Sequence, residues 1–273
     1  MAQPLRAWPP WAALPGAARR PLTLERPASK LGAVLIMRLP RAAPFVVVAL
    51  ILSGTGETLA GAEPELPAYK APRHLTPRAR IGGGLRGRDG DEPAVTALVP
   101  DHVGITAKQH PELNWFLSKR TSLPIRFTLM DEHSTRALVE RPITNPEKAG
   151  VQAIRLSDID VALQPNIQYR WYISVIRDAG SPSRNIITGG MIERCEFSEC
   201  LVLDATTACS RDAVVRSAAN GFWYDAMGCV CDLIETDPED MSLRKQRAAL
   251  LEQVGLHEVA EWDLAPNHAR SFQ

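Results

Sequence analysis

Residues 163–175 read LQPNIQYRWYISV, and this stretch decides the fold that the sequence predicts. Apolar and polar side chains alternate from residue 169 onward, which is the period of a β-strand with one buried face. The side chains on the apolar face are Tyr169, Trp171, Ile173 and Val175. We interpret Tyr169, Trp171 and Pro165 as structural residues of a core between two sheets. The alternative, that Tyr169 and Trp171 stack on a ligand, is disfavoured because they face inward.

Short β-type segments separated by turn residues fill residues 94–195. The sequence contains seven of them: Val95–Val99, Asn114–Ser118, Ile125–Met130, Arg136–Val139, Val151–Leu156, Tyr169–Ile176 and Ile186–Ile192. No long stretch of helical period interrupts them. Seven short strands over about 100 residues predict an antiparallel β-sandwich domain.

The turn before the strand indicates a particular kind of sandwich. Leu163, Pro165 and Tyr169 resemble the tyrosine corner of fibronectin type III and immunoglobulin-like domains. In that motif the tyrosine hydroxyl hydrogen-bonds to the backbone just upstream and fixes the crossover between the sheets. The resemblance implies an immunoglobulin/fibronectin-like sandwich.

After residue 200 the hydrophobic period changes to that of a helix. One face of a first helix carries Phe222, Ala226, Cys229, Val230 and Leu233, and one face of a second carries Leu243, Arg247, Leu250, Leu251 and Val254. An earlier helix is expected over Asp212–Asn220 and a short last one over residues 257–262. The sequence thus predicts an α+β protein whose helical unit, residues 204–265, looks like a tetratricopeptide-type hairpin. No second copy follows at a fixed period, so a repeat array is not expected.

Residues 37–62 have the order of a secretory signal peptide. Arg38 and Arg41 form the positively charged region, residues 45–52 the apolar region, and residues 60–62 a small-residue cleavage site. The apolar region is far shorter than the ~20 residues that a membrane-spanning helix needs. We therefore expect an exported protein, periplasmic or extracellular, with no membrane span in the mature chain.

Composition sets the remaining boundaries. Residues 1–36 are rich in Ala, Pro and Arg without a period, and we interpret them as a non-native leader or a misassigned start. Residues 63–93 are rich in Pro, Gly and Arg and are expected to form a flexible linker. The formal net charge is zero, so no basic field indicates a nucleic-acid partner.

Acidic residues and histidines offer few candidates for catalysis. Asp101, His102 and His110 flank a Gly-Ile-Thr turn, and Asp158 and Asp160 alternate beside another turn. The six histidines and five cysteines lack the spacing of a metal site, and there is neither a Walker A pattern nor a G-x-S-x-G elbow. We expect no metal and no cofactor. An envelope hydrolase that uses these loop Asp and His residues remains the alternative function.

The odd number of cysteines leaves at least one thiol unpaired within a monomer. Cys195 and Cys200 are close enough in sequence for a turn to join them, and we predict that they form a disulfide, with Cys209 as a competitor for Cys200. Cys229 is expected to be a buried, unreactive thiol on the apolar face of its helix. Cys231 should point away from that face.

The GFWYDA stretch holds the candidate binding residues, Trp223, Tyr224 and Asp225. Trp and Tyr near an exposed face often anchor partners. We favour the alternative that this cluster packs the helices against the sandwich, because a junction between two layers needs large apolar side chains.

Five segments in this order resemble the bacterial family known as domain of unknown function 928. They are TALVPDHVGITAKQHPELNWF, LQPNIQYRWYISV, SPSRNIITGGMIER, GFWYDAMGCVCDLI and VGLHEVAEWDL, and together they cover roughly Thr96 to Leu264. The resemblance implies an exported bacterial protein and no particular activity. We expect a non-enzymatic binding or assembly module of the cell envelope, with an envelope protein or glycan as partner.

Overall fold

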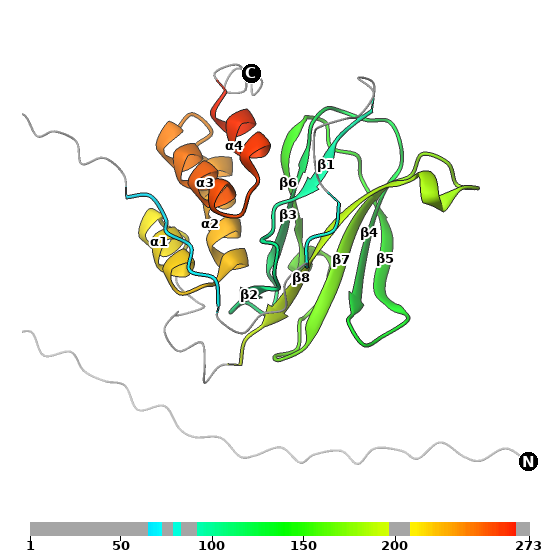
Figure 1. The fold of residues 1–273 in the computed structure, drawn as a ribbon, viewed down its shortest axis with the longest axis horizontal. Helices are drawn as coiled ribbons and strands as arrows, with labels where there is room; N and C mark the ends of the chain where they lie inside the picture. Colours follow the sequence, from blue (N-terminus) through cyan, green and yellow to red (C-terminus); the bar gives the residue numbers. More distant parts are fainter. Residues whose placement is uncertain (1–64, 73–78, 83–91, 197–207, 266–273) are drawn as a thin grey trace, which may run out of the picture. The chain divides into compact units, whose positions relative to one another are not determined.

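Two β-sheets form from the alternating segments, and four helices follow them in the chain (Figure 1). The computed structural model describes residues 65–72, 79–82, 92–196 and 208–265. The signal-peptide interpretation of residues 37–62 and the leader at residues 1–36 lie outside these ranges.

The smaller sheet has three antiparallel strands in the order β1-β3-β6. These are β1 (Val95–Ala97), β3 (Glu112–Leu117) and β6 (Gly150–Arg155). The larger sheet has the order β2-β8-β7-β4-β5. Its strands are β2 (Gly104–Thr106), β8 (Ile186–Arg194), β7 (Gln168–Val175), β4 (Ile125–Asp131) and β5 (Ala137–Ile143). Only β2 runs parallel to its described neighbour, β8.

All seven predicted strands are present, with ends shifted by a few residues. Strand β7 buries alternate side chains, beginning with Tyr169, as its sequence predicts. Most buried apolar residues of both sheets belong to one hydrophobic core, while Met191 of β8 packs with Ala79 and Val103 in a second, small cluster. Strand β2 was not predicted, because three residues are too few to show alternation.

The helices are α1 (Arg211–Ala219), α2 (Trp223–Thr236), α3 (Met241–Gln253) and α4 (His257–Leu264). Ser210 caps α1 by accepting a hydrogen bond from the backbone N–H of Ala213, and Asp240 caps α3 in the same way. Two short 3-10 turns lie among the strands, η1 (Leu156–Ile159) and η2 (Pro182–Arg184). No helix in the described ranges is long and apolar enough to cross a membrane.

Helix α2 is buried along most of its length because it contacts β2 and β3 on one side and α1 and α3 on the other. Its buried residues belong to the same core as those of the two sheets. The segments predicted as separate domains, residues 94–195 and 204–265, therefore share one hydrophobic core.

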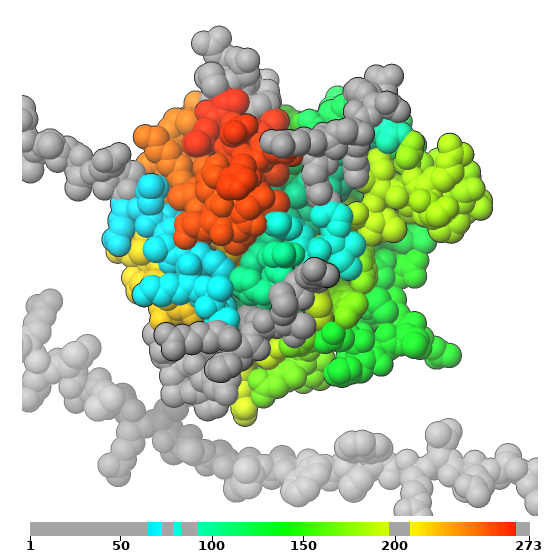
Figure 2. All heavy atoms as spheres, in the orientation of Figure 1, coloured from blue at the N-terminus to red at the C-terminus, as the bar shows by residue number. Residues whose placement is uncertain are grey.

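Residues 65–72 differ from the flexible linker that composition predicts. They lie across the helices (cyan in Figure 2), where the backbone N–H of Lys70 donates to the carbonyl of Ala218. The side chain of Gln253 donates to the carbonyl of Pro67. Tyr69 packs edge-on against Trp223, with ring centroids 5.0 Å apart. This segment is ordered because its backbone hydrogen-bonds to the helices and its aromatic ring packs against Trp223. Its Pro-rich composition does not predict these contacts.

Candidate functional site

The three candidate binding residues at the start of α2 lie in the interior. Trp223 and Tyr224 are fully or almost fully buried, and Asp225 is 6% exposed. The indole N–H of Trp223 donates to the carbonyl of Leu98, 2.9 Å away. Asp225 accepts a hydrogen bond from the backbone N–H of Ala107 at 3.0 Å, and burial raises its pKa. These contacts fasten α2 to the strand region and leave none of the three on the surface.

The structural residues of the opening stretch join β7 to the turn before it and to the core. The hydroxyl of Tyr169 accepts a hydrogen bond from the backbone N–H of Gln164 at 3.0 Å. The indole N–H of Trp171 donates to the hydroxyl of Tyr224 at 2.9 Å, inside the core. Pro165 forms an isolated bridge with Arg194.

The catalytic candidates occupy scattered positions. His102 stacks on Tyr69, and its Nε2 lies 2.8 Å from the tyrosine hydroxyl. Burial lowers the pKa of His102, while the charge of Asp101 opposes this effect. Asp158 and Asp160 are exposed on η1 and at its end. The His102 ring is therefore paired with an aromatic ring, and Asp158 and Asp160 lie on the surface. The structure does not bring His102 and this aspartate pair together in one cleft.

His110 has a separate contact. Its Nδ1 lies 2.8 Å from the carbonyl oxygen of Val161, and its ring is exposed. This bond joins the loop before β3 to the turn after η1.

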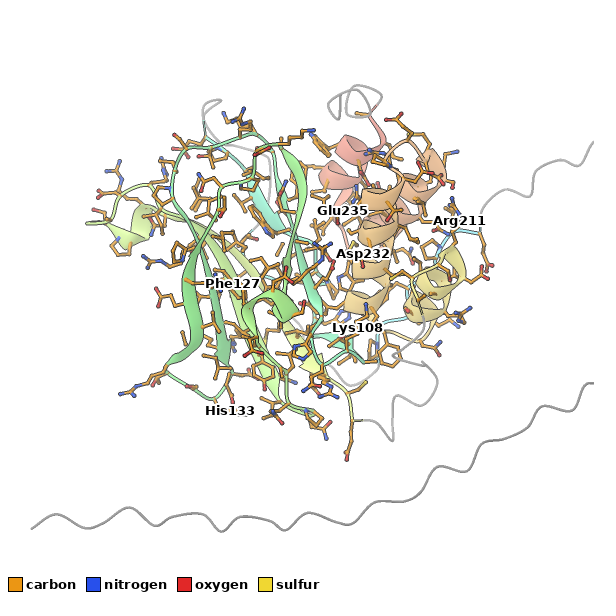
Figure 3. The ribbon with its side chains drawn as sticks, turned by 180° about the vertical axis from the view of Figure 1, so that it is seen from behind. Lys108, Phe127, His133, Arg211, Asp232 and Glu235 are labelled. Atoms are coloured by element: carbon orange, nitrogen blue, oxygen red, sulfur yellow. The ribbon has the colours of Figure 1, made fainter. Side chains whose placement is uncertain are left out.

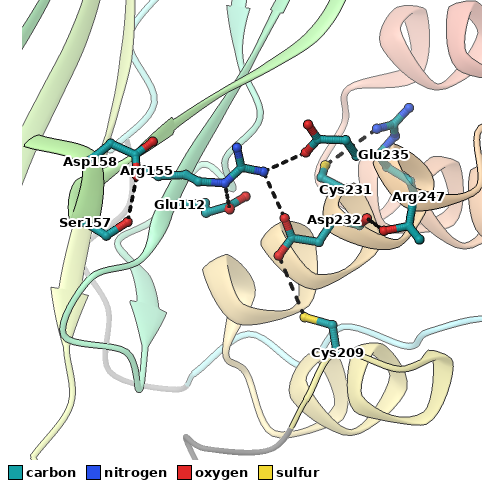
Figure 4. A network of polar contacts seen from close by, with 10 residues as sticks. Glu112, Arg155, Ser157, Asp158, Cys209, Cys231, Asp232, Glu235 and Arg247 are labelled. Carbon is teal, nitrogen blue, oxygen red and sulfur yellow. Dashed lines mark hydrogen bonds and ion pairs between the residues drawn. The ribbon is translucent and has the colours of Figure 1, made fainter.

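A cluster of charges lies on the seam between the sheets and α2. Arg155 of β6 is 2.5 Å from Glu112, 3.1 Å from Asp232 and 2.7 Å from Glu235 (Figure 4). Glu112 and Arg155 face each other across β3 and β6, and the other two carboxylates stand three residues apart on α2. Figure 3 shows three side chains between the sheets and the helices, those of Lys108, Asp232 and Glu235. We call these four residues, Glu112, Arg155, Asp232 and Glu235, the seam cluster.

Glu112 is the most buried member of the seam cluster, with a residue exposure of 9%. Its Oε1 binds Arg155, whereas Oε2 has no hydrogen-bond partner among the described residues. Burial raises the pKa of Glu112, and the charge of Asp232 raises it further against the effect of Arg155. Gly228 of α2 faces Glu112, and a Cβ added there would make an ordinary van der Waals contact, 3.5 Å from Cβ of Glu112.

A surface hollow lies at one end of the sheets. Ile125 pairs with Val175, and Val175 pairs with Ile186, so β4 begins where β7 ends and β8 begins. The loops of residues 118–124 and 176–185 consequently meet at this end. They enclose a hollow of about 610 Å³. Its lining consists of Glu92, Pro93, Arg120, Thr121, Ser122, Leu123, Arg177, Asp178, Arg184 and Ile186.

The charges of this loop-end hollow are three arginines and two carboxylates. Arg177 forms an ion pair with Glu92 and donates to the carbonyl of Arg184, 3.3 Å away, which orders the loop. The guanidinium of Arg184 is 3.9 Å from Asp178, and its side chain is 67% exposed. Arg120 is exposed as well. Sequence reasoning missed these arginines because they lie on two polar loops far apart in the chain.

Among the described cysteines, Cys209, Cys229 and Cys231 are free thiols, and no disulfide joins two cysteines within this set. The predicted Cys195–Cys200 bond cannot be placed on the structure because Cys200 lies outside the described residues. It stays a prediction.

A family model for a domain of unknown function, DUF928, matches residues 81–264. The chain belongs to the DUF928 family. The match includes both sheets and all four helices, and therefore also the seam cluster and the loop-end hollow of this DUF928 domain. No curated protein matches the sequence closely enough to count as a relative.

Proposed function

We propose that this DUF928 protein is an exported, non-enzymatic binding module of the bacterial cell envelope. It holds an acidic group of an envelope glycan, or of an envelope protein, in the loop-end hollow. The observation that carries this proposal is the set of three arginines that two loops bring to one hollow. Guanidinium groups bind carboxylates through charge-assisted hydrogen bonds. Arg177 is paired with Glu92, whereas Arg120 is exposed and Arg184, 67% exposed, lies 3.9 Å from Asp178.

The strand order supports a finer description of the fold, an immunoglobulin/fibronectin-like sandwich. The orders β1-β3-β6 and β8-β7-β4-β5 match strands A-B-E and G-F-C-C′ of that topology. The loops of residues 118–124 and 176–185 then correspond to the B–C and F–G loops, which bind antigen in variable domains. This step is an analogy of fold, and it agrees with the position of the hollow.

Two further parts of the proposal come from the sequence. Export to the periplasm or the outside is supported by the order of charged, apolar and small residues in 37–62. The tetratricopeptide-like interpretation of the helical unit is supported by the packing of α1 on α2 and of α3 on α4.

A titration with a carboxylated polysaccharide tests this function. We expect the full chain to bind polygalacturonate but not neutral dextran, with an affinity that falls as salt is added. Replacing two of the arginines, Arg120→Glu with Arg184→Glu, should weaken binding by about tenfold or more. Arg216→Glu, the same change on the exposed surface of α1, should leave binding unchanged.

Equal binding by the double variant and the wild type would show that the hollow is not the site. A wild-type protein that ignores polygalacturonate, or binds dextran equally well, would overturn the acidic-glycan form of the proposal.

A further inference from the structure

Two thiols from different elements meet close to the seam. Cys209 directly precedes Ser210, the cap of α1, and Cys229 lies in the middle of α2. Cys229 Sγ lies 3.8 Å from the carbonyl oxygen of Ser210, so it faces the chain segment that carries Cys209. Cys209 Sγ lies 3.9 Å from Oδ2 of Asp232, which stands three residues after Cys229 on α2. Both sulfurs therefore lie between residues 209–210 and the same turn of α2.

The surroundings give the two thiols different reactivity. Cys209 is partly exposed, with Sγ 3.9 Å from Asp232, whereas Cys229 is buried. The interaction with Cys229 lowers the pKa of Cys209 and the positive charge of Lys108 adds to this effect, while burial, Asp232 and Glu112 oppose it. The interaction with Cys209, together with burial, raises the pKa of Cys229. An accessible thiol that ionises readily is the one that attacks an external disulfide.

We propose that Cys209 and Cys229 form an intramolecular disulfide when the protein meets a disulfide-bearing oxidant. The Cys209 thiolate attacks one sulfur of the oxidant, which releases one thiolate and leaves a mixed disulfide. Cys229 gives its proton to the released thiolate, attacks the sulfur of Cys209 and displaces the second thiolate. Two cysteine thiols are oxidised, and one disulfide is reduced to two thiols.

The bond fastens the beginning of α1 to the middle of α2. Of the three free thiols among the described residues, Cys231 stays unpaired, since Met227 and Arg247 lie beside it, with atoms 4.0 and 3.6 Å from its sulfur. Burial raises the pKa of Cys231 to about 11, which keeps it protonated and slow to react. The inference stands on the placement of both thiols between residues 209–210 and α2, and it is independent of the function proposed for the loop-end hollow.

Oxidation of the reduced full chain with oxidised glutathione tests this inference. Peptide mapping should find Cys209 joined to Cys229, and the urea midpoint should rise because the crosslink restricts the unfolded chain. Cys209→Ser and Cys229→Ala should remove both effects. Cys231→Ala is the matched control on the same helix, and it should retain both.

Three results would overturn the inference. The first is a protein in which Cys209 and Cys229 both stay open to alkylation after oxidation under native conditions. The second is a lasting glutathione adduct on Cys209 that Cys229 never displaces. The third is a mapped bond from either residue to another cysteine, such as Cys195 or Cys200, in place of the pair.

Discussion

Tyr169 combines a buried ring with a single directed hydrogen bond. Its ring lies in the core at the start of β7, and its hydroxyl accepts the backbone N–H of Gln164 at 3.0 Å. We expect Tyr169→Phe to lower the free energy of unfolding by roughly 1–3 kcal/mol, because the N–H of Gln164 loses its partner. Urea unfolding measures this difference.

Tyr172→Phe is the control, since Tyr172 lies on the same strand but on its half-exposed face. Its loss should be clearly smaller. An equal decrease in the free energy of unfolding for the two variants would mean that the hydrogen bond of Tyr169 adds little stability. Burial of the ring would then be the main contribution of Tyr169.

At the scale of elements, α2 docks on β2 because Gly104 has no side chain. A Cβ at Gly104 would lie 2.6 Å from the ring of Tyr224. That ring cannot easily move, since its hydroxyl donates to the carbonyl of Met191 at 3.0 Å and accepts from Trp171 at 2.9 Å. Gly104→Ala should therefore destabilise the protein by roughly 1–3 kcal/mol, the usual effect of overpacking.

Gly180→Ala provides the comparison, because a Cβ there would come no closer than 3.4 Å to the side chain of Asp178. Thermal or urea unfolding should show little change for it. A Gly104→Ala variant as stable as the wild type would show that α2 can shift on β2 without loss.

At the scale of the whole molecule, we expect the seam cluster, which joins the sheets to α2, to make the free energy of unfolding depend on pH. Burial and Asp232 raise the pKa of Glu112 in the folded state. A carboxyl with a raised folded pKa adds stability that is fully present below its unfolded pKa and is lost as pH rises through the folded value. Glu112→Gln removes this pH-dependent contribution to stability, because glutamine does not titrate. Arg155 keeps Asp232 and Glu235 as partners in the variant. The variant should gain stability relative to the wild type as the pH rises above about 4.3, the ordinary pKa of a glutamate side chain.

Urea unfolding of both proteins across this range checks the sign. Asp158→Asn, a change to an exposed carboxylate on the neighbouring η1, serves as the control and should not reproduce the trend. The expectation would be contradicted if the free energies of unfolding of Glu112→Gln and the wild type differed by the same amount at every pH.

The sequence by itself determined most of the local structure. Seven strands and four helices lie close to where periodicity places them, because burying one face imposes a period of two or 3.6 on nearby residues. The inward face of β7 and the hydrogen bond of Tyr169 depend on residues only a few positions apart, so the turn and strand pattern was enough to predict them. The family, too, is visible in the sequence.

Only the tertiary structure decided which distant residues meet. No periodic signal marks the short parallel strand β2, the arginines of the loop-end hollow or the approach of Cys229 to the segment of Cys209 and Ser210. Trp223 and Tyr224 have the composition of a binding surface, yet the packing of α2 against the strands buries them. Such contacts join segments tens of residues apart, and their partners are set by strand order and helix docking rather than by neighbours in the chain.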